Sequence, residues 1–503
     1  MATFSDEKLM IEDIFSGEIR RAFGFTPTAE QSAAIEEFSR FAVCRDGQSL
    51  MILTGSAGTG KTTLAGAIVR AMQDMKQRVV LMAPTGRAAK VFSLNAGSEA
   101  FTIHRRIYRQ KTYTGEDTGF SLNYNKHQHT LFIVDEASMI PSGTSSQSIF
   151  GSGHLLDDLM QYVYGGQHCR LMLIGDKAQL PPVGEEESPA LSPQVMEHYG
   201  VRVFRADLNE VLRQSAESGI LWNATMIRQM ITHDEMTQLP RIVFNRFADI
   251  IRVPGDELIE QLSSSYSHVG IDETMVVVRS NKRANIYNNG IRAMVLGREE
   301  PLTSGDLLMV VKNNYYWIQE KNQEERIIRT DTEEEEGKEE ELSFLANGDR
   351  MKVRRVRNQQ ELYGFTFADA TLVFPDYDDY EVEATILLDT LQSEAPALTH
   401  EQGEQLFNAV MEDYADVPLK SERLKKLRND RFFNALQIKY AYAVTCHKAQ
   451  GGQWAHVYVD QGYMTDDMLT PDYIHWLYTA FTRATEQLFL VNWPKTQIQE
   501  INI

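Results

Sequence analysis

Residues Gly55-Ser-Ala-Gly-Thr-Gly-Lys-Thr62, called the P-loop below, form a glycine-rich turn between two patterned segments. The buried-strand pattern Leu50–Leu53 precedes the turn, and helix-forming residues from Thr62 to Met72 follow it. Glycines let successive backbone N–H groups close around phosphate oxygens at the positive end of a helix dipole. The pattern therefore predicts a nucleotide site in which Lys61 reaches the β- and γ-phosphates and Thr62 ligates Mg²⁺.

Two later strand patterns end in residues that suit this site. Leu131–Val134 leads into Asp135, placed to hold Mg²⁺ through water, and Glu136, placed to orient or deprotonate an attacking water. This pair indicates a hydrolase rather than a kinase; the alternative is that the two acids begin a helix. The strand Leu171–Ile174 leads to Gln179, a candidate sensor of the γ-phosphate or an ordinary polar strand end.

The rest of the chain repeats the alternation of short apolar runs and helix-forming sequence. This alternating pattern predicts an α/β fold with buried strands in doubly wound parallel sheets. The predicted strands are Leu50–Leu53, Val79–Met82, Leu131–Val134, Leu171–Ile174 and Met275–Val278, and after residue 436 they are Ile438–Val444, Val457–Val459 and Leu488–Val491. Between about 300 and 435, Gly-Asp turns and runs rich in Tyr and Trp instead predict a small β-rich insertion.

Composition excludes several classes of protein. The 503 residues are 43% hydrophobic, which excludes wholesale disorder, and no apolar run approaches the ~18 residues of a membrane-spanning helix. The first residues carry acids and no basic run, so we expect no secretory signal. Three widely spaced cysteines exclude a disulfide framework and a Cys-rich zinc site, and they favour a reducing cytoplasm.

A net charge of −20 argues at first against a polyanionic partner. Most of the excess acid, however, lies in residues 185–187, 331–341 and 376–383, which we interpret as solvated loops or faces. Basic residues cluster at 105–111, 350–357 and 420–431. Because salt screens charges beyond ~8–10 Å, local basic patches decide phosphate binding more than the total charge does.

The motifs, taken in order, resemble those of the superfamily 1B DNA helicases of the RecD and Dda type over about residues 26–491. The resembling segments are Thr28–Gln31, Gly55–Thr62, Ala83–Lys90, Thr102–His104, Val134–Ser138, Gly175–Pro182, Leu208–Gln214, Tyr442–Gly451 and Tyr478–Ala484, with weaker matches at Val277–Arg283 and Asn347–Asp349. The resemblance implies two RecA-like parallel-sheet domains, a β-hairpin pin and a small SH3-like accessory domain. The implied boundaries are 1–207 for the first RecA-like domain with a pin at about 106–128, 208–300 and 436–503 for the second, and 301–435 for the SH3-like insertion.

The resemblance also implies ATP and Mg²⁺ as cofactors and gives individual residues a role. The implied catalytic residues are Lys61, Glu136, Gln179, Arg213 and Arg483, and the two arginines act as fingers that pair with the γ-phosphate when the RecA-like halves close. The metal ligands are Thr62 and Asp135. The implied nucleotide-binding residues are Gln31, which reads adenine, Gly55, Ser56, Ala57, Gly58, Thr59, Gly60, Lys61, Thr62, Thr63, Gln450 and Gly451.

Further residues are implied to contact nucleic acid. The single-strand track consists of Pro84, Thr85, Lys90, His104, Thr445, His447 and Lys448. Two partly alternating runs flank the turn Gly115–Gly119 and predict a hairpin. In the resembling helicases this hairpin is the wedge, and Tyr108, Tyr113 and Phe120 are the candidates to stack on the junction base pair. The alternative is a hairpin that packs on the first domain.

Together these residues predict an ATP-dependent DNA helicase that moves 5′→3′ on single-stranded DNA and unwinds duplex in replication, repair or recombination. We expect a cytoplasmic monomer that binds single strands and duplex junctions and no membrane. The polarity follows from the resemblance alone. Three alternatives stay open: an RNA helicase of the same superfamily, a RecD-like motor subunit of a larger complex, and a nonmotor NTP switch.

Overall fold

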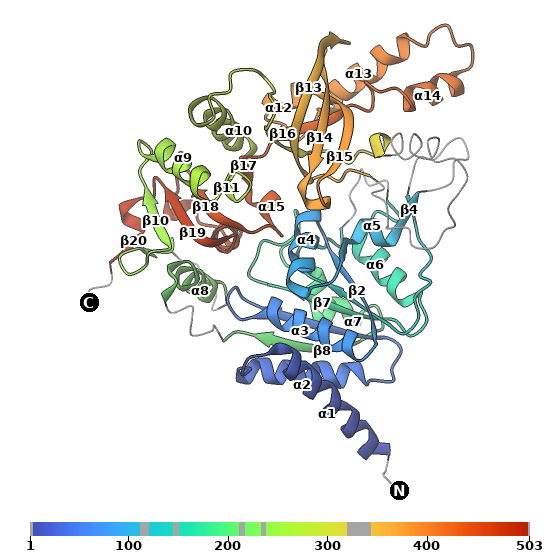
Figure 1. Ribbon diagram of the computed structural model, residues 1–503, viewed down its shortest axis with the longest axis vertical. Helices are drawn as coiled ribbons and strands as arrows, with labels where there is room; N and C mark the ends of the chain where they lie inside the picture. The colour runs from blue at the N-terminus through green and yellow to red at the C-terminus, as the bar shows by residue number, and fades with distance from the viewer. Residues whose placement is uncertain are drawn as a thin grey trace. The chain divides into compact units, whose positions relative to one another are not determined.

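The computed structural model describes residues 4–110, 120–143, 150–210, 217–232, 238–318 and 344–500 (Figure 1). The chain divides into two compact units, and each is treated by itself. Unit 1 comprises residues 1–253 and 449–503, and unit 2 comprises residues 254–448. The three-domain boundaries drawn from the sequence stay a prediction.

Unit 1 is built on a six-stranded parallel sheet with the strand order β3-β2-β6-β7-β1-β8. The strands β1 and β6 are buried along their whole length, which explains why they read as continuous apolar runs. The strand predictions at 50–53, 79–82, 131–134 and 171–174 are confirmed. The bounds are β1 (Ser49–Gly55), β2 (Arg78–Ala83), β3 (Ala100–Thr102), β6 (Thr130–Val134), β7 (Arg170–Gly175) and β8 (Arg202–Leu208).

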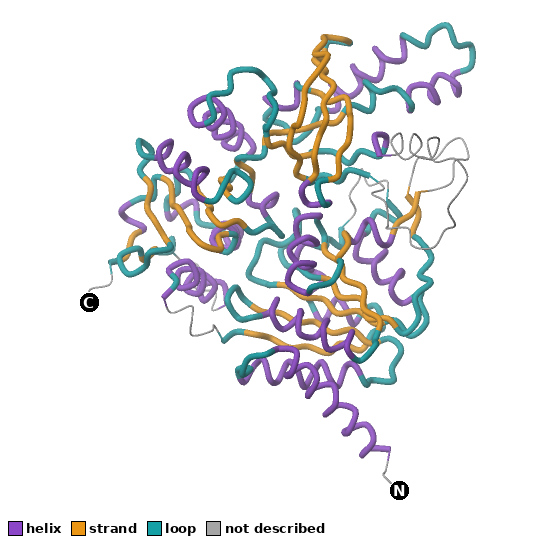
Figure 2. Tube along the Cα trace, in the orientation of Figure 1, coloured by secondary structure: helices purple, strands orange, loops and turns teal. Residues whose placement is uncertain are grey.

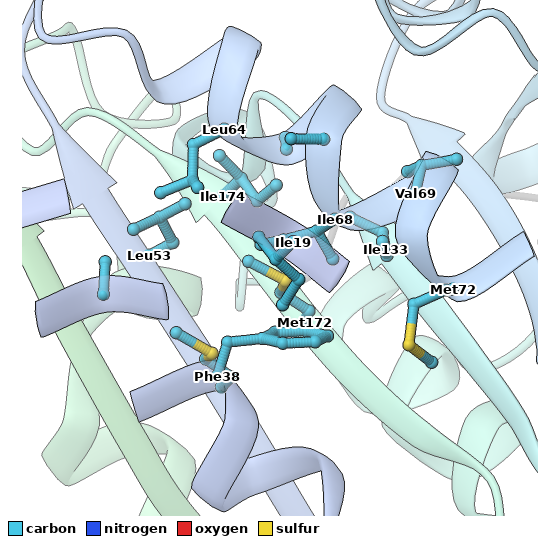
Figure 3. Close-up of a cluster of buried hydrophobic side chains, with 14 of the residues drawn as sticks. Ile19, Phe38, Leu53, Leu64, Ile68, Val69, Met72, Ile133, Met172 and Ile174 are labelled. Carbon is cyan, nitrogen blue, oxygen red and sulfur yellow. The ribbon is translucent and has the colours of Figure 1, made fainter. Parts of the chain in front are cut away.

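Helices α1 (Phe4–Phe23), α2 (Ala29–Ala42) and α3 (Lys61–Asp74) share a hydrophobic core with this sheet. Figure 3 shows the side chains of the three helices and of β1, β6 and β7 gathered in this core, and it labels Ile19, Phe38, Leu53, Leu64, Ile68, Val69, Met72, Ile133, Met172 and Ile174. Each large apolar side chain contributes about 1.5–3 kcal/mol when fully buried. The core therefore fixes the end of β1 and the start of α3, the two points between which the P-loop runs.

The remaining elements of unit 1 include helices and smaller strand pairings. They are α4 (Gly86–Ala96), α5 (Ile103–Ile107), β4 (Tyr108–Gln110), β5 (Phe120–Leu122), α6 (Leu155–Tyr164), α7 (Pro193–Glu197), α8 (Gly219–Thr232), β9 (Ile242–Val243), β10 (Ile250–Val253), β18 (Trp454–Asp460), α16 (Pro471–Phe481), β19 (Ala484–Val491) and β20 (Ile498–Gln499). The strands β10, β19 and β18 pair in parallel, as do β9 and β20. The antiparallel pair β4–β5 agrees with the two flanks of the predicted hairpin, whose turn at 111–119 lies outside the described residues.

Unit 2 contains a closed five-stranded barrel, which confirms the predicted β-rich insertion (Figure 2). Its strands are β12 (Leu307–Val310), β13 (Arg350–Leu362), β14 (Phe365–Phe374), β15 (Tyr380–Leu387) and β16 (Leu436–Tyr440). Neighbouring strands from β12 to β15 are antiparallel, as are β12 and β16, whereas β15 and β16 pair in parallel. The segment between β15 and β16 forms α12 (Asp389–Gln392), α13 (His400–Glu412) and α14 (Lys420–Arg428) beside the barrel (Figure 1).

The other elements of unit 2 are α9 (Leu258–His268), β11 (Thr274–Val278), α10 (Asn281–Gly290), β17 (Ala443–Thr445) and the start of α15 (Cys446–Ala449), and β11 pairs with β17 in parallel. The prediction of one strand over 438–444 is wrong, because β16 ends at Tyr440 and β17 begins at Ala443. The buried side chain of Asn288 holds this break: its Nδ2 donates to Tyr440 O (3.2 Å) and Ala443 O (2.9 Å), and its Oδ1 accepts from Tyr442 N (3.0 Å) and Ala443 N (2.8 Å).

A buried carboxylate joins the barrel to the chain around this break. Asp306, which precedes β12, is fully buried and accepts hydrogen bonds from Arg292 Nε (3.0 Å), Arg298 Nη1 (2.6 Å) and Tyr442 Oη (2.8 Å). Its second oxygen accepts from Arg292 Nη2 (2.9 Å) and Thr303 N (2.8 Å). Burial by itself would raise the pKa of Asp306, but the hydrogen bonds from Arg292 and its other partners hold it below the ordinary value.

We expect Asp306→Asn to lower the free energy of unfolding by about 3–5 kcal/mol, because it leaves two guanidinium groups around a neutral amide. Urea denaturation followed by circular dichroism measures this loss. Asp272→Asn is the control, since Asp272 forms an exposed ion pair with Lys352 (3.3 Å) and such pairs contribute less than about 1 kcal/mol. Equal, small losses in the two variants would contradict a structural role for the Asp306 cluster.

Candidate nucleotide site and nucleic-acid interface

The conformation and the close contacts of the P-loop backbone require glycine at several positions. Gly58 and Gly60 both have a φ of +78°, a left-handed conformation that side chains disfavour. A Cβ on Gly55 would lie 2.9 Å from Thr59 Oγ1 and 3.1 Å from Leu208 Cβ, closer than packing allows. The loop therefore runs as a tight turn from β1 into the first turn of α3, where backbone N–H groups have no partner within the helix.

The groups expected to bind phosphate and metal lie around this turn. Lys61 Nζ donates to Gly55 O at 3.0 Å, so the ammonium folds back over the start of the loop. Burial and the charge of Glu136 raise the pKa of the Asp135 carboxyl to about 7, while the charge of Lys61 acts in the opposite direction. A divalent cation beside Asp135 would stabilise its charged form. Thr62 and Asp135 fit Mg²⁺, which usually takes one or two protein oxygens and completes its shell with phosphate and water.

Three of the predicted catalytic residues meet beside the P-loop sheet. Arg483 Nη1 lies 3.9 Å from Glu136 Oε1, and the arginine is only 2% exposed. With its amide oriented to satisfy both neighbours, Gln179 donates to Glu136 Oε2 (3.2 Å) and accepts from Arg483 Nη2 (3.0 Å). Glu136 has a φ of +53°, a strained conformation of the kind found at functional sites. Arg213, another of the five predicted catalytic residues, lies outside the described residues.

Backbone carbonyls hold the Arg483 guanidinium in this position. Its Nε donates to Thr479 O (3.1 Å) and its Nη1 to Gly452 O (3.1 Å). These contacts fix the direction of the side chain without neutralising its charge. The charge is therefore available to Glu136 and to an anion bound beside it.

The side chain of Gln31 is tied to the P-loop itself. Gln31 and Thr28 form a capping box at the start of α2, in which Gln31 Oε1 accepts from Thr28 N (3.0 Å). Gln31 Nε2 donates to Thr59 O (2.9 Å). The adenine contact implied for this residue stays a prediction.

The predicted nucleotide residues Gln450 and Gly451 lie against two other motifs of unit 1. Gln450 Nε2 donates to Leu180 O (2.6 Å), and a Cβ on Gly451 would lie 2.9 Å from Ala88 Cβ. Gly451 also has a φ of +72°. Gln450 and Gly451 therefore contact the motifs Gly175–Pro182 and Ala83–Lys90, and their contact with nucleotide stays a prediction.

Helix α16 carries contacts that the sequence analysis missed. Tyr478 Oη donates to Asp176 Oδ2 (2.5 Å) and accepts from Ala57 N of the P-loop (3.0 Å). Burial raises the pKa of Tyr478 well above its ordinary value, so the hydroxyl remains a donor. Thr479 Oγ1 accepts from Leu180 N (2.8 Å), and His475 Nδ1 lies 2.9 Å from Ala178 O. The spacing of 475, 478 and 479 places them on one helix face, but it does not indicate what that face contacts.

The predicted track residues fall into both units. Pro84 and Thr85 lie between β2 and α4, where Thr85 Oγ1 caps the helix by accepting from Ala88 N (3.2 Å), and Lys90 lies within α4. His104 lies in α5. These four residues belong to unit 1, whereas Thr445, His447 and Lys448 belong to unit 2.

A small pocket in unit 2 is lined in part by Thr445 and Lys448. Its polar lining consists of Asn281, Asn285, Asn288, Lys439, Thr445 and Lys448. Burial lowers the pKa of the Lys448 ammonium to about 8, and the charge of Lys439 acts in the same direction. Lys439 donates to Thr390 O (2.9 Å), but within the described residues no hydrogen bond or ion pair is seen for Lys448. An anion in this pocket would satisfy that charge.

The wedge candidates lie partly within an aromatic cluster of unit 1. Tyr108 and Phe120 are buried, and the ring centroids of both lie about 5 Å from that of Phe150. Tyr108 Oη also donates to the buried Asp158 (2.7 Å). Tyr113 lies outside the described residues. The two described rings therefore pack within the domain, and the wedge role stays a prediction.

His104 belongs to the same cluster, with its ring centroid 4.9 Å from that of Phe150. Burial lowers the pKa of the His104 imidazole to about 4, although the charge of Asp158 acts in the opposite direction. The ring is therefore neutral near pH 7. Any contact that it makes with a nucleic acid uses stacking or a neutral hydrogen bond rather than a positive charge.

Two arginines of the basic run at 350–357 pair with the acidic run at 376–383 on the barrel surface. Arg354 contacts Glu381, and Arg357 Nη2 lies 2.9 Å from Glu383 Oε1. These side chains are 39–71% exposed, so the ion pairs are solvated. The acidic run at 331–341 lies outside the described residues.

Comparison with known proteins agrees with this arrangement. The AAA domain family matches residues 26–239, and the UvrD-like helicase C-terminal domain family matches residues 440–491. The chain therefore belongs to the superfamily 1B helicases. Helicases of the RecD and Dda type are among its relatives.

Individual relatives match parts of the chain. The ATP-dependent RecD2 DNA helicase of Deinococcus radiodurans is 31% identical over 160 residues, which are 31% of this chain and 18% of that protein. The ATP-dependent DNA helicase dda of Enterobacteria phage T4 is 25% identical over 262 residues, 51% of this chain and 55% of that protein. The chain spans at most about half the length of these curated relatives.

Among solved structures, Pif1 helicase from Bacteroides in complex with ADP-AlF3 and ssDNA covers 94% of this chain and 94% of its own, at 15% identity and a TM-score of 0.43. In the described residues, no helix combines the length and the apolar character needed to cross a membrane.

We expect the His104 imidazole resonances to stay constant from pH 8 to 5.5 and to move only near pH 4 in a two-dimensional NMR titration. The physical reason is that burial penalises the charged ring. The His104 resonances are assigned as those that are missing from the spectrum of His104→Gln. A midpoint near 6.5, the ordinary histidine value, would contradict the burial of the ring.

Proposed function

We propose that the protein is an ATP-dependent DNA helicase that translocates 5′→3′ on single-stranded DNA and unwinds duplex at junctions. The observation that carries the proposal is the contact of Gln179 with both Glu136 and Arg483. This contact joins a residue suited to activate water with one suited to stabilise phosphate charge. The similarity to RecD2 and dda, both ATP-dependent DNA helicases, supports the same function.

In the proposed reaction, the P-loop amides and Lys61 bind the phosphates of ATP. Thr62 and Asp135 would hold Mg²⁺, and the bound ion would supply positive charge beside the phosphates. Glu136 orients the attacking water and accepts its proton, and Arg483 stabilises the charge that develops on the γ-phosphate. Because Gln179 contacts both side chains, loss of the γ-phosphate changes the position of its amide.

Hydrolysis becomes movement if the strand is gripped differently before and after the reaction. In unit 2, the pocket beside Lys448 offers a cation to a backbone phosphate. In unit 1, Pro84, Thr85, Lys90 and the neutral His104 complete the proposed track. We propose a monomeric cytoplasmic motor, with the aromatic residues near the β4–β5 pair as the wedge.

ATP hydrolysis should rise strongly when single-stranded DNA is added, and Lys61→Ala and Glu136→Gln should each lower turnover by about 10²–10⁴-fold. Lys61→Ala removes a phosphate contact, and Glu136→Gln removes the proton acceptor. A coupled assay of ADP release measures both, and circular dichroism checks that the variants fold. The exposed Lys495→Ala is the control for loss of a positive charge in unit 1 and should match the wild type.

If neither DNA nor RNA raises the rate of ATP hydrolysis, the motor function is contradicted and an NTP switch is favoured. Stimulation by RNA alone would favour the RNA helicase. Unwinding of 5′-tailed and 3′-tailed duplexes then tests polarity. Unwinding from the 3′ tail alone would overturn the proposed direction. Hydrolysis without unwinding of either duplex would favour a subunit of a larger complex.

Lys448→Ala should weaken binding of single-stranded DNA and lower the slope of log K against log salt by about 1, because one phosphate contact is lost. Fluorescence anisotropy at several salt concentrations measures the slope. Lys312→Ala, which removes an exposed lysine of the same unit, is the matched control. The same slope in the wild type and in Lys448→Ala would argue that the pocket does not bind phosphate.

A further inference from the structure

Arg228 on α8 reaches the P-loop from outside the motifs by which the chain resembles its family. Its Nη1 donates to Ser56 Oγ at 3.1 Å, and its Nη2 donates to Asn209 Oδ1 just after β8. The two ends of the Arg228–Ser56 contact are 172 positions apart in the chain. All three residues belong to unit 1.

The positive charge of Arg228 has no acidic partner in the part of the chain that the structure describes. Both of its contacts there are neutral oxygens, a hydroxyl and an amide. A guanidinium carries five N–H donors and stays charged at any physiological pH. The side chain is half-buried, so it keeps donors for an anion while it is partly shielded from water.

The position of the contact along the P-loop indicates which anion this is. Lys61 Nζ donates to Gly55 O (3.0 Å), and Arg228 donates to the next residue, Ser56. The lysine of a P-loop serves the β- and γ-phosphates. Two cations therefore lie at the same end of the loop, where the terminal phosphates of a nucleotide bind.

The neighbouring contacts hold Arg228 in this place. Glu30 Oε2, in the first turn of α2, accepts hydrogen bonds from the backbone N–H groups of Asn209 and Glu210. These bonds fix the backbone at Asn209, whose side chain orients Arg228. The guanidinium is thus preorganised, which lowers the entropic cost of using it for binding.

We propose that Arg228 binds the terminal phosphate of the bound nucleoside triphosphate together with Lys61 and makes the site prefer a triphosphate over a diphosphate. The inference rests on the proposed function, since it requires the P-loop to bind ATP. Arg228 uses a free N–H donor to form a charge-assisted hydrogen bond to a γ-phosphate oxygen. A diphosphate lacks that oxygen and loses this contact.

The test compares the wild type with Arg228→Gln and Arg228→Lys in the full chain. Isothermal titration calorimetry measures the affinity for AMP-PNP and for ADP, each with Mg²⁺. Arg228→Gln should weaken AMP-PNP binding about tenfold or more, and ADP binding by less than about threefold. Arg228→Lys keeps the charge without the planar fork and should recover part of the loss. Arg205→Gln, which removes an exposed arginine of β8, should leave both affinities unchanged.

Equal weakening of AMP-PNP and ADP would overturn the inference, because Arg228 would then act only by holding Ser56. Unchanged AMP-PNP binding in Arg228→Gln would overturn it as well. If Arg228→Gln does not fold, Asn209→Ala provides the same test, since it removes the group that orients Arg228 and should weaken AMP-PNP selectively. A wild type that binds neither nucleotide would instead refute the proposed function.

Discussion

The tight approach of Gly55 to Thr59 and Leu208 sets the geometry on which the nucleotide site depends. The end of β1 must pass so close to these residues that no side chain fits, and the loop can then turn through Gly58 and Gly60 into α3. The hydrophobic core anchors the strand and the helix on either side. Because the two anchors do not move, the cost of ordering the loop is met in folding rather than in binding.

The parts of the site that follow directly from strand ends were predictable from local sequence. Asp135, Glu136 and Gln179 come after buried apolar runs, and the carboxyl ends of parallel strands meet at one edge of a sheet. A β-rich insertion was predictable because the α/β pattern is interrupted between about 300 and 435. The number of strands and the closure of the barrel were not predictable. The position of Arg483 required the resemblance to a family, because nothing near it in the sequence points to Glu136.

Other contacts were not predictable because each joins distant segments through a single side chain. Tyr478 contacts Ala57 across 421 positions, and a lone tyrosine on an apolar helix reads as a core residue. Asn288 likewise resembles an ordinary polar residue of a helix, yet its side chain bonds the backbone where β16 ends and β17 begins. Asp306 gave no signal for the same reason. Side-chain hydrogen bonds of this kind leave no periodicity, which is the main source of information in one sequence.

The Asp306 cluster has a consequence for how such a barrel is exchanged between proteins. The chain enters the barrel just after Asp306 and leaves it at Tyr440, and the hydroxyl of Tyr442 closes the gap between entry and exit. The barrel is therefore an insertion whose entry and exit are joined by the hydrogen bond between Asp306 and Tyr442. A transplanted barrel would need to retain the aspartate at its entry and the tyrosine two residues past its exit to form this cluster.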